Sequence, residues 1–193
     1  MEHITLPNLF FQKALENSDK PFLWAKRNKE WKSLSWHETE VRVKQVAAGL
    51  KYHGIMPGDK IIIVSENRPE WIISDLAINT LNAITVPAYV TNTEDDHRYI
   101  IEHSDAKAVI VSDNIIANRI ALALSKVNSC KLLITMDEYS GFMPEGLKVE
   151  SYEKLTQIGE DNISTALHNL NTIDKDDICC LIYTSGTGGR PKG

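Results

Sequence analysis

The sequence has few of the features that disulfide-stabilised, membrane-spanning or nucleic-acid-binding proteins need. Its three cysteines form no disulfide framework and no metal-ligand spacing, because two are adjacent and the third is isolated. We therefore expect Cys130, Cys179 and Cys180 to be small core residues. No stretch reaches the roughly 18 consecutive apolar residues of a membrane-spanning helix. The net charge of −5 gives no general attraction to nucleic acid or to anionic lipid.

A secretory signal is also missing from the start of the chain. Residues 1–20 have neither a basic beginning nor a continuous apolar core. We therefore predict a cytoplasmic protein, for which peripheral contact with a membrane stays open. What is present is a globular composition, with 42% hydrophobic and 24% charged residues over 193 positions. A chain of this length can bury a substantial core.

Periodicity along the chain alternates between strand and helix. A hairpin is expected around Arg27 and Asn28, and a capping box at Ser35 and Glu38 predicts the start of a helix that ends near Gly54. Further strands are expected at 60–65, 84–86, 108–111 and 131–135, and further helices at 67–82, from 93 onward, and at 113–126. The continuous β-branched run at 60–65 is typical of a strand in a parallel sheet. This pattern predicts an α/β fold, with a doubly wound, mostly parallel sheet and flanking helices.

Three segments are expected along the chain. Residues 1–135 are predicted to form a first α/β subdomain. Residues 136–172 are predicted to link two lobes through a loop and short helices at 151–158 and 163–170. Residues 173–193 are predicted to contain a buried strand, at 178–182, and a loop that together begin the next subdomain and a second sheet.

The loop after this last strand is suited to polyphosphate. It reads YTSGTGGRPKG from Tyr183 to Gly193. Glycines let backbone N–H groups approach phosphate closely, hydroxyls donate hydrogen bonds, and cations neutralise charge. The predicted phosphate ligands are Thr184, Ser185, Gly186, Thr187, Gly188, Gly189 and Lys192. The alternative is a polar, glycine-rich linker without function.

Two common phosphate loops and one catalytic motif are excluded by spacing. A Walker A loop needs a second glycine where Pro191 stands, and Ser or Thr after its lysine, where this chain has Gly193. A dinucleotide-binding fingerprint also needs glycine at position 191. Ser185 lacks the flanking glycines of a hydrolase nucleophile.

The loop resembles the phosphate-binding signature of the acyl-adenylate-forming (AMP-binding) superfamily, which contains acyl-CoA synthetases, adenylation domains and luciferases. Only Gly188 departs from the pattern, since Thr or Ser is more frequent there. Upstream segments resemble the N-terminal part of long-chain fatty-acid CoA ligases. The similar segments include WKSLS from Trp31, GIMPGDKIIIVSENRPEW from Gly54, and NAITVPAYVTNTEDDHRYIIEHSDAKAVIVS from Asn82.

This resemblance implies an N-terminal fragment of the large adenylate-forming domain of an ATP-dependent acyl-CoA ligase. In such enzymes a fatty acid attacks the ATP α-phosphorus to give acyl-AMP and pyrophosphate, and the CoA thiol then displaces AMP. ATP, Mg²⁺ and CoA are thus the expected cofactor and co-substrates, with the loop holding the β and γ phosphates. The family's catalytic residues lie downstream of Gly193. The chain alone is therefore expected to be a poor catalyst. The alternative is an inactive fragment that binds or complements a separate C-terminal portion.

Other polar and aromatic residues have simpler interpretations. His97 and His103 are six residues apart, which does not align them as metal ligands, and no metal site is predicted. The acidic residues at 94–96 suit the first turn of a helix. In a chain of negative net charge, core packing explains tryptophan better than base stacking does. This interpretation covers Trp24, Trp31, Trp36 and Trp71.

Overall fold

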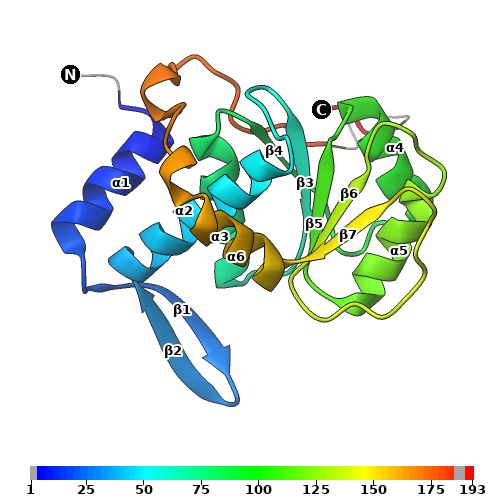
Figure 1. The fold of residues 1–193 in the computed structure, drawn as a ribbon. Helices are drawn as coiled ribbons and strands as arrows, with labels where there is room; N and C mark the ends of the chain where they lie inside the picture. The colour runs from blue at the N-terminus through cyan, green and yellow to red at the C-terminus, as the bar shows by residue number, and fades with distance from the viewer. Residues whose placement is uncertain (1–3, 185–189) are drawn as a thin grey trace. The chain divides into compact units, whose positions relative to one another are not determined.

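A computed structural model describes residues 4–184 and 190–193 (Figure 1). The chain divides into two compact units. The first comprises Met1–Pro57, Asn67–Asn82 and Thr156–Asp177, and the second comprises Gly58–Glu66, Ala83–Leu155 and Ile178–Gly193. None of the helices within the described residues is long and apolar enough to cross a membrane.

The first unit contains three long helices and a hairpin. Its elements are α1 (Leu6–Asn17), β1 (Pro21–Arg27), β2 (Glu30–Ser35), α2 (Trp36–Tyr52), α3 (Pro69–Thr80) and the 3-10 helices η1 (Ile163–Thr165) and η2 (Leu170–Thr172). Helix α2 packs against both α1 and α3. Its buried side chains recur at helical spacing, with Val43, Val46 and Leu50 all fully buried. Helix α1 was not among the expected elements, and the helix expected at 163–170 is replaced by the two short 3-10 turns.

The hairpin and the capping box are confirmed. Strands β1 and β2 are antiparallel, and their two turn residues, Asn28 and Lys29, have positive φ angles of 52° and 68°. Positive φ at both positions matches the twist of a two-residue hairpin turn. At the start of α2, the Glu38 amide donates to Ser35 Oγ (3.1 Å) and the Ser35 amide donates to Glu38 Oε2 (2.7 Å). These bonds satisfy two of the donors that a helix N-terminus leaves unpaired.

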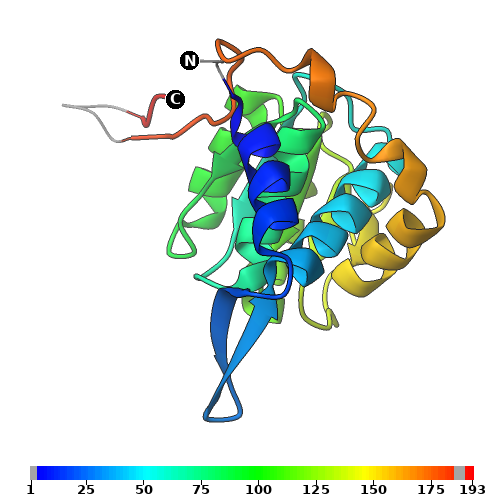
Figure 2. The same cartoon turned by 90° about the vertical axis from the view of Figure 1, so that its left-hand side faces the viewer.

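The second unit is built on a five-stranded parallel sheet with helices (Figures 1 and 2). Its strands lie in the order β4-β3-β5-β6-β7, and every neighbouring pair is parallel. The elements are β3 (Lys60–Val64), β4 (Ile84–Pro87), α4 (Glu94–Ser104), β5 (Ala108–Val111), α5 (Asn114–Leu124), β6 (Leu132–Thr135) and β7 (Lys148–Ser151), after which α6 (Tyr152–Asp161) begins. The predicted α/β class, a parallel sheet flanked by helices, is confirmed.

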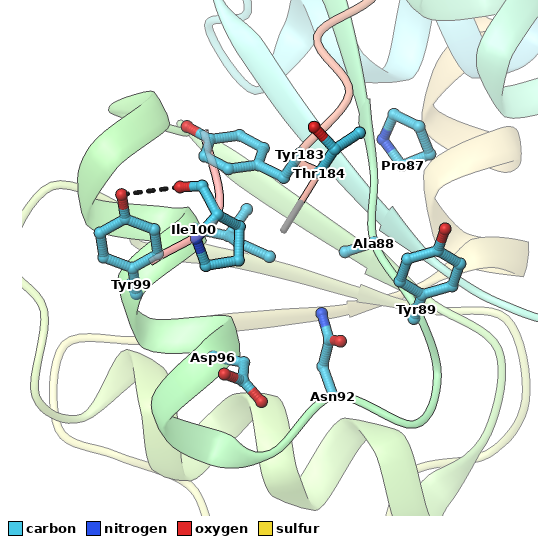
Figure 3. Close-up of a pocket in the computed structure, with 10 residues that line it drawn as sticks. Pro87, Ala88, Tyr89, Asn92, Asp96, Tyr99, Ile100, Tyr183 and Thr184 are labelled. Carbon is cyan, nitrogen blue, oxygen red and sulfur yellow. Dashed lines mark hydrogen bonds between the residues drawn. The ribbon is translucent and has the colours of Figure 1, made fainter. Parts of the chain in front are cut away.

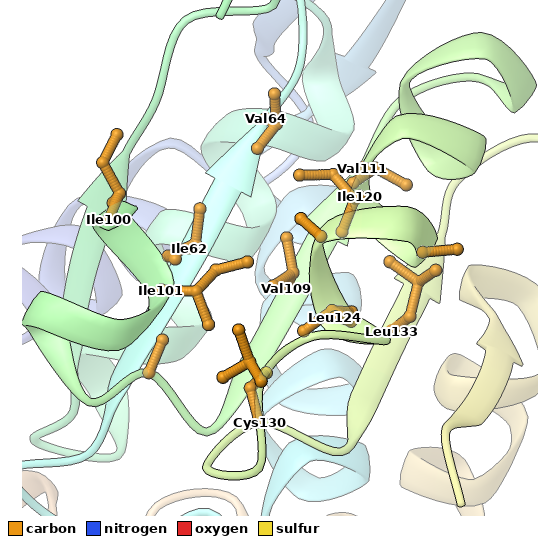
Figure 4. Packing of buried hydrophobic residues seen from close by; sticks show 14 of the residues in the cluster. Ile62, Val64, Ile100, Ile101, Val109, Val111, Ile120, Leu124, Cys130 and Leu133 are labelled. Carbon is orange, nitrogen blue, oxygen red and sulfur yellow. The ribbon is translucent and has the colours of Figure 1, made fainter. Parts of the chain in front are cut away.

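The core of the second unit lies between this sheet and helices α4 and α5 (Figure 4). Strand residues Ile62, Val109 and Leu133 contribute to one buried cluster together with Ile101 of α4 and Ile120 of α5. Each side chain of this size contributes about 1.5–3 kcal/mol when it is fully removed from water. The continuous apolar runs in the sequence are therefore explained by strands that have little contact with solvent.

One predicted feature of the middle segment differs from the structure. Strand β7 lies within the segment expected to hold only a loop and short helices. Its sequence, KVES, is too short and too polar to show strand periodicity. Helix α6 confirms the helix expected at 151–158. The predicted boundaries at residues 135 and 172 remain a prediction.

The expected burial of tryptophan and cysteine is only partly correct. Trp36 stacks on Phe22 with ring centroids 3.7 Å apart. By contrast, Trp24 and Trp31 are 56% and 66% exposed, so core packing is the wrong explanation for them. They lie on the outer part of a two-stranded hairpin, where no described residue buries them. Cys130 is buried as expected. Cys179 and Cys180 are exposed, contrary to the prediction.

Candidate functional site

The segment that leads into the candidate phosphate loop runs beside β4. The Thr85 amide donates to the Cys179 carbonyl (3.0 Å), and the Leu181 amide donates to the Thr85 carbonyl (2.9 Å). The segment is therefore held on one side by the edge of the five-stranded sheet. The expected burial of this segment is wrong, because Ile178 and Ile182 are 65% and 61% exposed, whereas its place at the start of a second sheet stays a prediction.

A pair of backbone hydrogen bonds closes the base of the loop. The Thr184 amide donates to the Lys192 carbonyl and the Lys192 amide donates to the Thr184 carbonyl, both at 3.0 Å. Thr184 and Lys192 are thus brought together, although seven residues separate them in the sequence. The other predicted ligands lie outside the described residues; they are Ser185, Gly186, Thr187, Gly188 and Gly189.

Helix α4 holds both arms of this closed loop. On the arm before the loop, the Tyr183 hydroxyl is 2.8 Å from His103 Nδ1. On the arm after it, the Tyr99 hydroxyl donates to the Pro191 carbonyl at 2.9 Å, the bond drawn in Figure 3. The Arg190 guanidinium lies 5.1 Å from the centre of the Tyr99 ring, close enough for a cation–π contact. The loop base therefore has a fixed position relative to α4.

The helix can hold both arms because of the spacing of its two contact residues. Tyr99 and His103 are four residues apart, so their side chains lie on the same face of α4. Their ring centroids are 5.3 Å apart, and the Tyr183 ring meets both rings nearly at right angles. Neither residue was predicted to belong to the site. The available signal was this four-residue spacing, which places two aromatic side chains on one helix face.

Burial fixes the chemical state of Tyr183. Its side chain is 7% exposed, and burial raises the pKa of its hydroxyl, with a smaller effect from Tyr99. Tyr183 therefore keeps its proton near neutral pH. The last residue of the motif packs against the same ring. A Cβ atom on Gly193 would lie 2.9 Å from Tyr183 Cε2, so only glycine fits there without displacement.

A cavity of about 320 Å³ opens beside the loop base (Figure 3). It is lined by Pro87, Ala88, Tyr89, Asn92, Asp96, Tyr99, Ile100, Tyr183, Thr184 and Pro191. Asp96 accepts hydrogen bonds from the Thr93 hydroxyl (2.7 Å) and amide (2.9 Å), and these bonds lower the pKa of its carboxyl group. The carboxylate is therefore ionised near neutral pH.

The two cationic side chains of the loop base are exposed to solvent. Arg190 and Lys192 are both exposed, and within the described part of the chain neither has an ion-pair partner. The positive charge is available to an anionic ligand. No group of three or more His, Cys, Asp or Glu residues that could hold a metal was found among the described residues. A magnesium ion here would suit a site where phosphate oxygens and water supply most ligands.

Comparison with known proteins identifies the family. The family model for "AMP-binding enzyme" matches residues 10–193. The chain is 28% identical to long-chain-fatty-acid–CoA ligase FadD15 of Mycobacterium tuberculosis over 193 residues, which are 100% of this chain and 31% of that protein. It is 30% identical to long-chain-fatty-acid–CoA ligase 6 of Rattus norvegicus over 200 residues, covering 97% of this chain and 26% of that one. The chain thus spans less than a third of these relatives.

Solved structures agree on the fold. The A-PCP didomain of a carboxylic acid reductase from Segniliparus rugosus, in complex with AMP, matches with a TM-score of 0.81 at 17% identity. The match covers 99% of this chain and 31% of that one. The adenylation domain of a carboxylate reductase from Mycobacterium chelonae matches with a TM-score of 0.76 at 19% identity, over 100% and 34% of the two chains. With the family match over nearly the whole sequence, these findings establish that the chain belongs to the AMP-binding enzyme family.

Proposed function

We propose that the chain supplies the pyrophosphate-binding part of an ATP-dependent ligase that converts a long-chain fatty acid to acyl-AMP and then to acyl-CoA. The observation that carries this proposal is the closed base of the loop. It brings together Thr184, near the start of the family's phosphate motif, and Lys192, near its end. The similarity to long-chain-fatty-acid–CoA ligases supports the substrate class. ATP, CoA and the fatty acid are the proposed small-molecule partners, in a cytoplasmic setting.

The loop's role in this reaction is to position phosphate and stabilise charge. The carboxylate oxygen forms a bond to the α-phosphorus while the bond to the bridging oxygen of pyrophosphate breaks, which moves negative charge onto the leaving group. The Lys192 ammonium and the hydroxyl and amide donors of residues 184–189 would stabilise that charge. Mg²⁺, bound to the phosphates, would neutralise part of it. Removing one such contact typically lowers the rate on the order of 10²-fold.

Calorimetric titration of the 193-residue chain with magnesium pyrophosphate and with magnesium ATP tests the loop's role. We expect both ligands to bind, and the Lys192→Ala variant to bind each about tenfold more weakly, because one charge-assisted contact is lost. The matched control is Lys154→Ala, which removes another exposed lysine at a distant position in the sequence. Equal affinities for wild type and Lys192→Ala would refute the proposed role.

Fatty-acid-dependent exchange of labelled pyrophosphate into ATP tests the proposed reaction. The chain alone is expected to give little exchange, because the adenine and acyl contacts of the family lie in regions beyond this segment. Exchange should appear when the chain is mixed with the remaining part of a long-chain acyl-CoA ligase, and it should depend on Lys192. Exchange with acetate but not with palmitate would contradict the long-chain assignment.

A second candidate function is binding without catalysis. It is favoured by the exposed apolar segment beside β4, where Ile178 and Ile182 are uncovered in the described structure. Uncovered strand edges with apolar side chains bind other chains readily. Replacing both isoleucines by threonine should then abolish association with a complementing chain in analytical ultracentrifugation, while leaving pyrophosphate binding unchanged.

A further inference from the structure

The outer part of the β1–β2 hairpin carries two exposed tryptophans on one face. The strand register pairs Trp24 with Ser33 and Lys26 with Trp31. Directly paired residues of antiparallel strands point to the same side, so both indole rings lie on the same face as diagonal neighbours. Their side chains remain 56% and 66% exposed. Figures 1 and 2 show the turn of the hairpin pointing away from α1, α2 and α3 of its own unit.

The same hairpin concentrates positive charge in a chain that is negative overall. Residues 21–35 contain four basic residues and one acidic residue, whereas the whole chain has a net charge of −5. Arg27 is paired with Glu70 of α3 at 2.6 Å, which fixes the hairpin to its unit. Lys26, Lys29 and Lys32 are exposed, and no described residue forms an ion pair with them. Of these three ammonium groups, Lys26 lies on the same face of the hairpin as the indole pair, Lys29 lies in the turn, and Lys32 lies on the opposite face.

We propose that this hairpin docks the protein on an anionic lipid surface. The indole rings of Trp24 and Trp31 would lie at the level of the headgroups, where amphipathic aromatic rings are most stable in a bilayer. The ammonium groups of Lys26, on the same face, and Lys29, in the turn, would bind headgroup phosphates and carboxylates. The short turn and the Arg27–Glu70 ion pair preorganise the hairpin before it binds, which lowers the entropic cost of binding. The negative net charge of the chain confines this attraction to the hairpin.

The observations favour lipid over nucleic acid as the occupant. A protein that binds single-stranded nucleic acid combines stacking aromatic residues with a positively charged groove that follows the backbone. Here the charges and rings lie on a projecting hairpin of two strands, which offers a convex tip. A convex, cationic and aromatic tip fits the interface of a bilayer. The proposal is independent of the ligase reaction, and it locates the membrane contact on named side chains.

Vesicle co-sedimentation of the 193-residue chain tests the proposal. We expect binding to vesicles of phosphatidylcholine with added phosphatidylserine, weaker binding to phosphatidylcholine alone, and a loss of binding as salt screens the charges. The double variant Lys26→Gln/Lys29→Gln should lower the partition coefficient about 25-fold, since each basic residue near an anionic surface contributes about fivefold. The double variant Trp24→Ser/Trp31→Ser should lower the partition coefficient at least about tenfold. It should also remove the blue shift of the tryptophan fluorescence that we expect when the wild type binds vesicles.

Matched controls separate the hairpin from general charge and apolar surface. Lys131→Gln/Lys154→Gln removes two exposed lysines elsewhere, and Leu15→Ser removes an apolar side chain that is 84% exposed. Both controls should bind vesicles like the wild type. The proposal is overturned if the chain does not bind anionic vesicles, if the hairpin and control variants weaken binding equally, or if single-stranded RNA binds better than vesicles and needs the same hairpin residues. Unchanged circular dichroism verifies that each variant is folded.

Discussion

The contact between His103 and Tyr183 should stabilise the base of the loop by a measurable coupling energy. His103→Phe keeps an aromatic ring against Tyr99 but leaves the buried Tyr183 hydroxyl without its partner. Leaving such a group unpaired costs about 1–3 kcal/mol. Tyr183→Phe removes the hydroxyl itself and should cost only about 1 kcal/mol. If the two groups interact, the double variant is destabilised by about 1 kcal/mol less than the sum of the single variants.

Urea unfolding of the four proteins gives this coupling energy. Hydrogen exchange of the Thr184 and Lys192 amides gives the local effect, because these two amides form the backbone bonds that close the loop base. We expect both amides to exchange faster in His103→Phe. Destabilisations that add to within about 0.3 kcal/mol, with unchanged exchange at both amides, would refute the role of α4 in holding the loop.

Three further predictions concern the second unit. Burial, with a contribution from Arg119, lowers the pKa of His97 from 6.5 to about 4. Between these pH values the unfolded chain binds a proton at His97 and the folded chain does not, so lowering the pH from 6.5 to 4 should reduce the free energy of unfolding by about 3 kcal/mol. His97→Gln should make this loss smaller, as measured by urea titrations at each pH. On α5, Ile120→Ala should cost about 2–5 kcal/mol, whereas Ile115→Ala, at a position 73% exposed, should cost less than about 0.5 kcal/mol in the same assay. Burial raises the pKa of the Cys130 thiol to about 11, whereas Cys179 and Cys180 are exposed. A thiol reagent should therefore label Cys179 and Cys180 in the folded chain and label Cys130 only when the chain unfolds. Rapid labelling of Cys130 in the folded chain would contradict its burial.

Local chemistry made most of the fold predictable. A few neighbouring residues are enough to identify the capping boxes at Ser35 and Thr93. The same is true of the apolar runs that form β3 and β5. Strand β7 could not be predicted, because its four residues form a strand only through pairing with β6. The exposure of the tryptophans on the hairpin was also unpredictable, since composition does not show whether another element covers a side chain.

The phosphate motif of the candidate site could be predicted from the sequence, but the contacts that hold the loop in place could not. Thr184 and Lys192 were identified from the phosphate signature, and the structure brings their backbones together. The hydrogen bonds from α4 to both arms depend on how a helix some 80 residues earlier packs, which no local pattern encodes. The exposure of the segment at 178–182 likewise depends on pairing with β4 on one side only. Long-range packing explains each of these differences.

The most direct test of the phosphate-binding role is a titration of the isotopically labelled chain with magnesium pyrophosphate, followed by two-dimensional NMR of the backbone amides. The account predicts that the largest shifts lie in the loop and its base, at Thr184, Arg190, Lys192 and Gly193, with smaller changes at Tyr99 and His103 of α4 and none on the β1–β2 hairpin. Shifts centred on another part of the chain, or no shifts at concentrations that saturate related enzymes, would contradict it.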